Sequence, residues 1–377
     1  MARRPWKFWF GVPIAALLFL GAALYLVGRI QSRLNVMDIE RYDPVSTLKV
    51  PQHPLKRAKY PFVDVHNHQF LMPVQDLGAL VAEMDELNLA VMINLSGFRG
   101  KILEWSLANV NKQHSNRFLV FLNLDFEKVD SSDWPAAALA QMDEGAKLGA
   151  KGLKVYKSLG LTERDGSGKR IAVDDPRLDS IWSKCGQLGW PVLIHSAEPS
   201  PFFEPKDEHN ERWLELKEYP SRARPPDRYP PFESILAEQH RMFRKHPETK
   251  FIDAHLGWLG NDLERLGRLF DELPNVSTEI GAVLAELGRQ PRAARAFLIR
   301  YQDRVLFGKD TYKKEEYSTY FRVLETADEY FDYYRKRYAH WKMYGLDLPD
   351  EVLRKIYYGN ALRLFPAIDR RLFPAAQ

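Results

Sequence analysis

The feature that most constrains the fold is a regular alternation of short apolar runs with segments of helical spacing, which begins after Tyr60. The eight runs cover residues 62–66, 90–95, 118–124, 151–156, 191–195, 250–255, 275–280 and 304–310. Strands that alternate with helices in this way are typical of a parallel sheet. An open doubly wound sheet is the competing arrangement, but no glycine-rich phosphate turn follows the first run. We therefore predict an α/β fold, a (β/α)8 TIM barrel over 60–377.

Two connections are longer than a barrel needs. Residues 196–231 follow the fifth run, and residues 311–350 follow the eighth. Both leave the carboxyl ends of strands, the face on which barrels carry their active sites. Long loops at that face often act as lids or substrate walls. Simple packing decoration is the alternative interpretation.

Histidines stand at the ends of several predicted strands. His66 and His68 end the first, and residues two apart on a strand point to the same side, so both are expected to face the barrel mouth. The other polar residues at strand positions are Lys154 in the fourth, His195 at the fifth, His255 at the sixth and Asp310 at the eighth. A single strand-end histidine is more often structural. Together, imidazole nitrogens and a carboxylate predict a site for Zn²⁺, Fe²⁺ or Mn²⁺.

The segments around these residues resemble one known family. They are similar to the amidohydrolase superfamily, and within it to the amidohydrolase-2-like branch of metal-dependent hydrolases. The matching segments are VDVHNH, GLKVYKSLGL, PVLIHSAEP, HPETKFIDAHLGW, RVLFGKDTY and KIYYGNALRLF. The resemblance covers about 60–370, nearly the whole body after the N-terminal segment. It does not identify one reaction, because members of this branch share the same metal ligands but catalyse different reactions.

The resemblance assigns roles residue by residue. His66, His68, His195 and Asp310 match the metal ligands, and the implied cofactor is a divalent metal, most simply zinc, with iron or manganese as alternatives. His255 and Asp310 match the catalytic residues that handle protons. Lys154 matches a lysine that bridges two ions as a carbamate in some relatives and is an ordinary cation in others. The number of ions, one or two, therefore stays open.

The leading functional prediction is a metal-dependent hydrolase of a small-molecule substrate. A bound ion lowers the pKa of its water to about 7, and this water would attack an amide, ester or lactone carbonyl. The first alternative is a non-oxidative decarboxylase of an aromatic or unsaturated carboxylic acid that uses the same metal site. The second alternative is a barrel that binds ligands without catalysis, although the complete ligand set argues against it.

Weaker candidates surround the predicted site. Glu279 ends the seventh strand and Arg99 follows the second, so both are predicted substrate contacts. Asp64 lies two residues before His66 and is expected to orient a ligand or a neighbouring strand. The first long connection also carries Arg222, Arg224 and Arg228, any of which could match a substrate carboxylate, although surface arginines are commoner.

The N-terminus carries a separate signal. Residues 1–7 are short and basic, and residues 8–28 contain no charge over a length that can span a bilayer. A cleaved signal peptide is the alternative, but its apolar region is usually about 7–15 residues long. We predict a single-pass transmembrane anchor at 8–28 and a linker at 29–59. The basic residues before the span favour an extracytoplasmic barrel, with membrane contact through the N-terminal helix.

Composition narrows the remaining possibilities. The chain has 377 residues and a formal net charge of +4, too mild to indicate nucleic acid, and it contains no nucleic-acid-binding motif. Its single cysteine, Cys185, excludes an intrachain disulfide and a thiolate metal cluster. The sequence leaves the oligomeric state open.

Overall fold

The computed structural model describes residues 11–338 and 340–375, with side chains from residue 16 onward. The chain divides into two compact units, one ending at Lys49 and the other beginning at Val50. The predicted basic segment 1–7 lies outside the described residues. Each unit is described here by itself.

The N-terminal unit is built on one helix, α1 (Gly11–Leu34). Its part Ala16–Leu34 is long and apolar enough to cross a membrane, and none of that window is buried, although a signal sequence has the same properties. The predicted span 8–28 ends before this helix does. Residues 8–10 lie outside the described part, and the helix continues six residues beyond 28 because Arg29 and Arg33 favour helix as much as the apolar residues do.

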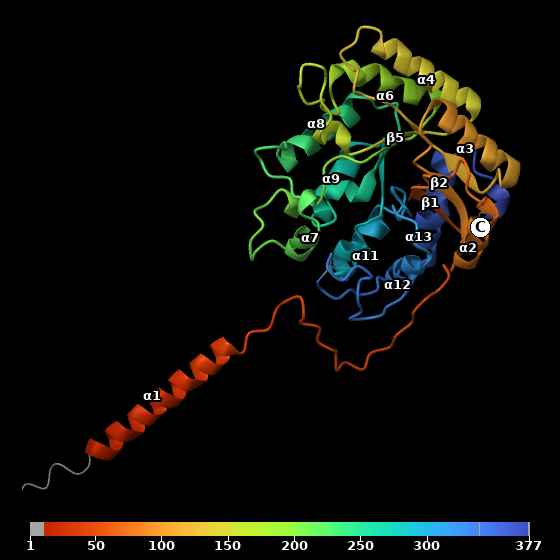
Figure 1. The fold of residues 1–377 in the computed structure, drawn as a ribbon. Coiled ribbons are helices and arrows are strands. Elements are labelled where there is room, and N and C mark those ends of the chain that lie inside the picture. The colour runs from red at the N-terminus through yellow and green to blue at the C-terminus, as the bar shows by residue number, and fades with distance from the viewer. Residues whose placement is uncertain (1–10, 339, 376–377) are drawn as a thin grey trace, which may run out of the picture. The chain divides into compact units, whose positions relative to one another are not determined.

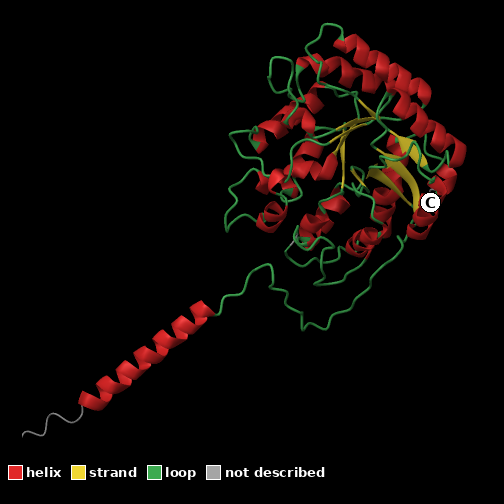
Figure 2. Cartoon of the chain, viewed as in Figure 1, coloured by secondary structure: helices red, strands yellow, loops and turns green. Residues whose placement is uncertain are grey.

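The second unit is a closed parallel barrel (Figure 2). Its strands are β1 (Phe62–Asn67), β2 (Leu89–Asn94), β3 (Phe118–Val120), β4 (Leu122–Asn123), β5 (Leu153–Val155), β6 (Val192–Ile194), β7 (Phe251–Asp253), β8 (Val276–Glu279) and β9 (Val305–Leu306). β3 and β4 are one strand interrupted at Phe121, whose amide still donates to Asn94 O at 2.9 Å. The eight predicted strands are therefore all present, in the predicted order.

Two hydrogen bonds close the barrel between its first and last strands. The amide of Val65 donates to Phe307 O at 3.0 Å, and that of Asp310 donates to His66 O at 2.6 Å. A parallel bridge pairs Asn67 with Asp310 just beyond them. Closure leaves no strand edge exposed, and it brings the ends of β1 and β9 together at the barrel mouth.

Helices surround the strands on the outside (Figures 1 and 2). The main ones are α2 (Leu77–Leu87), α3 (Gly100–Gln113), α4 (Trp134–Leu148), α6 (Asp179–Leu188), α8 (Phe232–Lys245), α9 (Leu263–Glu272) and α11 (Pro291–Arg300). A final helix, α13 (Asp350–Arg354) and α14 (Asn360–Leu364), is joined through a π-helical turn at Lys355–Gly359. Inside the barrel, the ring of Phe121 lies over Gly152, where a Cβ atom would be 2.3 Å from that ring.

The end of the predicted linker belongs to the barrel unit. The backbone amide and Nδ1 of His53 each lie 2.6 Å from the carboxylate of Asp328, and Lys59 Nζ donates to Asp350 at 2.6 Å. Because these bonds fix residues 50–59 against the barrel, the irregular connection is shorter than the predicted 29–59. It runs from 35 to 49.

Both long connections are folded onto the barrel. The first contains the short helix α7 (Trp213–Glu218), and the second contains α12 (Tyr317–Glu325). The hydroxyl of Tyr317, which is fully buried, donates to Asp64 on β1 at 2.6 Å. Asp64 also accepts from the side chain of Asn67 and from the amides of His66 and Lys309. The second connection is thus bonded directly to the first strand.

Candidate metal centre

The predicted site residues gather where the strands end. His66 lies within β1, His255 in the turn after β7, and Asp310 four residues beyond the end of β9. An atom from each of these three lies within 4.8 Å of the other two. His66 Nε2 is 3.4 Å from Asp310 Oδ1, and His68 Nε2 is 3.7 Å from the same oxygen. The period-two spacing of His66 and His68 therefore brings both rings to one carboxylate.

The remaining histidine joins the same group. The ring of His195 lies 4.6 Å from that of His255, measured between centroids, and His255 is 4.8 Å from His66. Trp258 covers the pair, at 4.7 Å from His255 and 5.5 Å from His195. The structure thus brings together all five residues that the sequence predicted as ligands or catalytic groups.

Strained backbone holds two of these side chains in place. His255, Leu256, Gly257 and Trp258 all have φ between 54° and 60°, a left-handed turn that L-residues rarely adopt. Asp310 has φ 80°. A Cβ atom at Gly257 would lie 2.3 Å from the carboxylate of Asp253, so the turn also requires glycine at that point. Strain of this kind persists only where the surroundings impose it, and it is common at functional sites.

Hydrogen bonds fix which ring nitrogen of each histidine faces the centre. Nδ1 of His255 lies 2.8 Å from Gly281 O, which can only accept, so Nδ1 carries the proton. Nδ1 of His66 donates to the carboxylate of Glu279 at 2.9 Å. In both rings Nε2 keeps a free lone pair. Such orientation of metal-binding imidazoles by carboxylates and carbonyls is typical of metal sites.

His68 is oriented through a short chain of hydroxyls. The hydroxyl of Tyr156 donates to Leu95 O at 3.2 Å, so it accepts from Ser96 Oγ at 3.1 Å. Ser96 Oγ then accepts from Nδ1 of His68 at 2.7 Å. This again leaves Nε2 of the imidazole with its lone pair toward Asp310.

Burial keeps the imidazoles of His66, His68 and His195 neutral. It lowers the pKa of His66 and of His195 well below the ordinary value, and lowers that of His68 to about 4. Burial would raise the pKa of the Asp310 carboxyl, but nearby positive charge, to which the Lys154 ammonium contributes, more than offsets this and lowers the pKa. Neutral imidazoles and an ionised carboxylate are the protonation states that metal binding requires.

Unpaired buried atoms support a metal at this point. Nε2 of His66, His195 and His255, and Nζ of Lys154, have no hydrogen-bond partner among the described residues. Orphaned buried polar atoms are costly, and their convergence on one place indicates a group that satisfies them. Burial also lowers the pKa of Lys154 to about 8. The donor set of imidazoles and carboxylate fits a divalent ion.

A pocket of about 120 Å³ opens beside this centre. Residues of both long connections line it. Its lining residues are Lys157, His195, Glu198, Pro199, Phe202, Arg212, Glu215, Arg222, His255, Trp258, Ala282, Asp310, Arg335 and Tyr338.

Most charges in the pocket wall are paired within the protein. Lys157 Nζ is 2.6 Å from Glu198, and Arg212 donates to Glu215 at 2.9 Å and also to Glu286. Arg335 differs, because its ion pair with Glu316 is the longest of these at 3.5 Å.

The Glu316 carboxylate also accepts a hydrogen bond from Lys309, so it is shared between Lys309 and Arg335. The guanidinium of Arg335 stacks on the rings of Tyr334 and Tyr338, each at 5.4 Å. Of the pocket cations, Arg335 is therefore the one with most hydrogen-bonding capacity left for a ligand.

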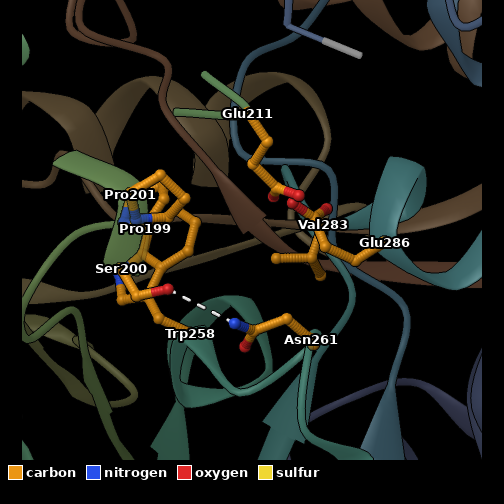
Figure 3. A pocket seen from close by; sticks show the side chains of 9 residues that line it. Pro199, Ser200, Pro201, Glu211, Trp258, Asn261, Val283 and Glu286 are labelled. Carbon is orange, nitrogen blue, oxygen red and sulfur yellow. Dashed lines mark hydrogen bonds between the residues drawn. The ribbon is translucent and has the colours of Figure 1, made fainter. Parts of the chain in front are cut away.

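A second, smaller cavity adjoins the pocket, and Figure 3 shows the side chains that line it. Pro199 and Trp258 line both cavities. Ser200 and Asn261, which line the smaller cavity, are joined by a hydrogen bond of 3.3 Å. Its volume of about 20 Å³ has room for roughly one water molecule. Trp258 therefore forms part of the wall of both cavities, the small one and the larger pocket beside the histidines.

Two predicted substrate contacts lie elsewhere. Glu279 is completely buried behind the histidines, where it accepts from His66 and from the amide of His255. Arg99 is exposed at the start of α3 and pairs with Asp125 at 2.8 Å. Neither lines the pocket.

Sequence reasoning missed several pocket residues. Trp258, Arg335 and Tyr338 come from a turn and an insert without strand periodicity, so no spacing rule pointed to them. The only available signal was the position of the inserts after strands.

We predict that Glu279→Gln weakens metal binding by about 10–100-fold, because one amide cannot hold His66 and the His255 turn as a carboxylate does. Calorimetric titration of the metal-free protein with Zn²⁺ and Mn²⁺ measures this. Glu233→Gln, an exposed partner of Arg265, is the matched control. Equal affinities in the two folded variants would contradict the role given to Glu279.

Comparison with known proteins identifies the family of the barrel. The family model described as amidohydrolase matches residues 126–367. The match begins after β4, so the placement of His66 and His68 rests on the structure. A comparison with curated proteins finds no match.

Solved structures share the fold at low identity. A 2,6-dihydroxybenzoate decarboxylase from Rhizobium is 16% identical, with TM-score 0.53, over 81% of this chain and 99% of that one. A dihydroxybenzoic acid decarboxylase from Polaromonas sp. JS666, with bound manganese and 2-nitroresorcinol, is 15% identical, with TM-score 0.53, over 83% and 99%. An uncharacterised TIM-barrel protein from Bordetella bronchiseptica is 16% identical, with TM-score 0.50, over 81% and 99%. With the family match over most of its barrel, the chain belongs to the amidohydrolase family of metal-dependent enzymes.

Proposed function

We propose that this protein is a metal-dependent hydrolase that cleaves an amide, ester or lactone in a small molecule bearing a carboxylate. The observation that carries the proposal is the convergence of three unpaired imidazole nitrogens and the unpaired Lys154 ammonium beside Asp310. This arrangement offers metal ligands, a proton acceptor and a cation within one buried centre. The adjoining pocket is of a size for a small substrate.

His66, His68, His195 and Asp310 would hold the metal, and His255 would lie beside them as a group that handles protons. Zinc suits these ligands best, and the alternatives are iron and manganese, the second of which the Polaromonas decarboxylase binds. When bound, a divalent ion polarises a carbonyl and makes water more acidic. Lys154 would either bridge a second ion as a carbamate or remain a cation facing the substrate.

The chain's own groups would move the protons. Asp310 is ionised at neutral pH because its pKa is lowered, and its side chain reaches the pocket, so it can accept a proton there. Nε2 of His255 also lies at the pocket wall with a free lone pair. A positioned general base of this kind typically contributes about 10²–10⁴-fold to the rate.

The pocket wall supports an anionic, partly apolar substrate. Arg335 would bind a carboxylate through its forked donors, and Phe202, Trp258 and Tyr338 would pack against an unsaturated or aromatic body. The cavity volume limits the substrate to a small molecule.

Decarboxylation of an aromatic or unsaturated acid is the second candidate. The buried ammonium of Lys154 favours it, because a decarboxylase needs a cation to hold the carboxylate beside the metal. The similarity in fold to two dihydroxybenzoate decarboxylases is consistent with this alternative.

A substrate panel distinguishes the two reactions. We expect the metal-loaded protein to hydrolyse carboxylated lactones, esters or amides, with product formation followed by chromatography, and to release no CO₂ from hydroxybenzoates. Asp310→Asn should lower turnover by about 10²–10⁴-fold, whereas Asp332→Asn, at an exposed position, should not. CO₂ release would favour the decarboxylase, and a folded protein that holds no metal would favour a binding protein.

A substitution at Arg335 tests whether this side chain binds a carboxylate of the substrate. Arg335→Gln should raise KM for the carboxylated substrate by about tenfold or more, because a hydrogen bond to a charged group contributes about 1.5–3 kcal/mol. Arg337→Gln is the matched control, since Arg337 is half exposed and pairs with Glu218 away from the pocket lining. If both variants keep the normal KM, Arg335 does not bind the carboxylate.

We further propose that α1 anchors the protein in a membrane with the barrel on the extracytoplasmic side. Support comes from the length and apolar character of Ala16–Leu34. The full-length chain should resist extraction from membranes by alkaline carbonate, and protease added from the outer side should digest the barrel. A mature chain shortened at its N-terminus, detected by intact mass, would instead identify a signal peptide.

A further inference from the structure

Exposed apolar side chains are concentrated in one region of the barrel unit. Eight large hydrophobic residues are exposed in its described part, and five belong to two adjacent segments. These five, here called the mouth patch, are Phe70, Leu71, Val74, Ile102 and Trp105, with exposures from 41% to 82%. Single exposed hydrophobic residues need no explanation, but a group of five suggests a contact surface.

The five side chains form one continuous surface. Asn109 on α3 donates to the backbone oxygens of Met72 and Gln75, so the loop after β1 runs along this helix. Ile102 and Trp105 precede Asn109 by seven and four residues on α3, which places them on the same helical face. They therefore flank the loop that carries Phe70, Leu71 and Val74.

The mouth patch borders the metal centre. The ring of Phe70 stacks on that of His68 at 5.6 Å between centroids. The loop follows the carboxyl end of β1, and α3 follows that of β2, so both segments belong to the active-site face. Whatever covers the patch therefore lies next to His68.

The patch is electrically neutral at its edge. Lys101 pairs with Glu104 at 2.7 Å, and Arg99 pairs with Asp125 at 2.8 Å. A partner recognised by charge would require uncompensated side chains. The chemistry of the patch, with a tryptophan among aliphatic residues, instead fits the interfacial region of a bilayer.

We propose that the mouth patch docks onto the surface of a lipid bilayer. The proposal rests on the anchor proposed above. Between Leu34, where α1 ends, and Val50 lie about 15 residues, which span at most about 50 Å when extended. An inserted α1 would therefore keep the barrel close to the membrane at all times, where even a weak apolar surface is held against lipid.

Site-directed spin labelling of the full-length chain in phosphatidylcholine vesicles tests the proposal. Cys185 is fully buried and burial raises the pKa of its thiol, so added cysteines take the label selectively. Labels are placed by Val74→Cys in the patch, by Glu248→Cys on the exposed loop before β7 at the other end of the barrel, and by Leu24→Cys in α1.

We expect the label at 74 to collide more with lipid-dissolved oxygen and less with aqueous nickel complex than the label at 248. Changing Leu71 and Trp105 together to glutamate should abolish this difference, whereas Tyr330→Glu, at an exposed aromatic outside the patch, should not. High salt should leave the difference unchanged, since the patch carries no net charge.

Equal nickel accessibility at 74 and 248 would overturn the docking proposal. So would protection of position 74 from both reagents together with dipolar broadening, which would indicate a second copy of the chain on the patch. The label at 24 reports the anchor separately: lipid exposure there with water exposure at 74 overturns docking alone. None of these measurements depends on enzyme turnover. A failure of the docking proposal is therefore distinguishable from a failure of the proposed reaction.

Discussion

A single buried carboxylate organises the centre of this enzyme. Glu279 accepts from the ring of His66 and from the backbone amides of His255 and Gly281, so it sets both the tautomer of one ring and the left-handed turn that presents another. A buried charge of this kind is tolerated only when its acceptor capacity is filled. The proposed metal ligands therefore depend on a residue that itself never reaches the pocket.

Much of the barrel could be predicted from the sequence because its signals are local. Each of the eight strands overlaps an apolar run of the sequence, because a strand of a parallel barrel is buried on both faces. The site histidines could be predicted for the same reason, since period-two alternation directs His66 and His68 to one side and the carboxyl ends of parallel strands meet at one mouth.

The pocket wall could not be predicted, because its residues are brought together by tertiary packing. Arg335 and Tyr338 lie in irregular chain, and Trp258 reaches the pocket through backbone that glycine and strain make possible. Glu279 was expected to face the substrate, because strand alternation predicts that a side chain points into the barrel but not how deep in the barrel it lies. The histidines in front of it occupy the mouth.

The bond between Tyr317 and Asp64 has a consequence for how this enzyme can change over evolution. The insert that supplies part of the pocket wall also supplies a donor to a carboxylate inside the first strand. Deleting or exchanging that insert would leave a buried charge short of a partner and destabilise the barrel itself. New specificities should therefore arise here by point substitutions in the wall, while the length and path of the insert stay constant in the lineage.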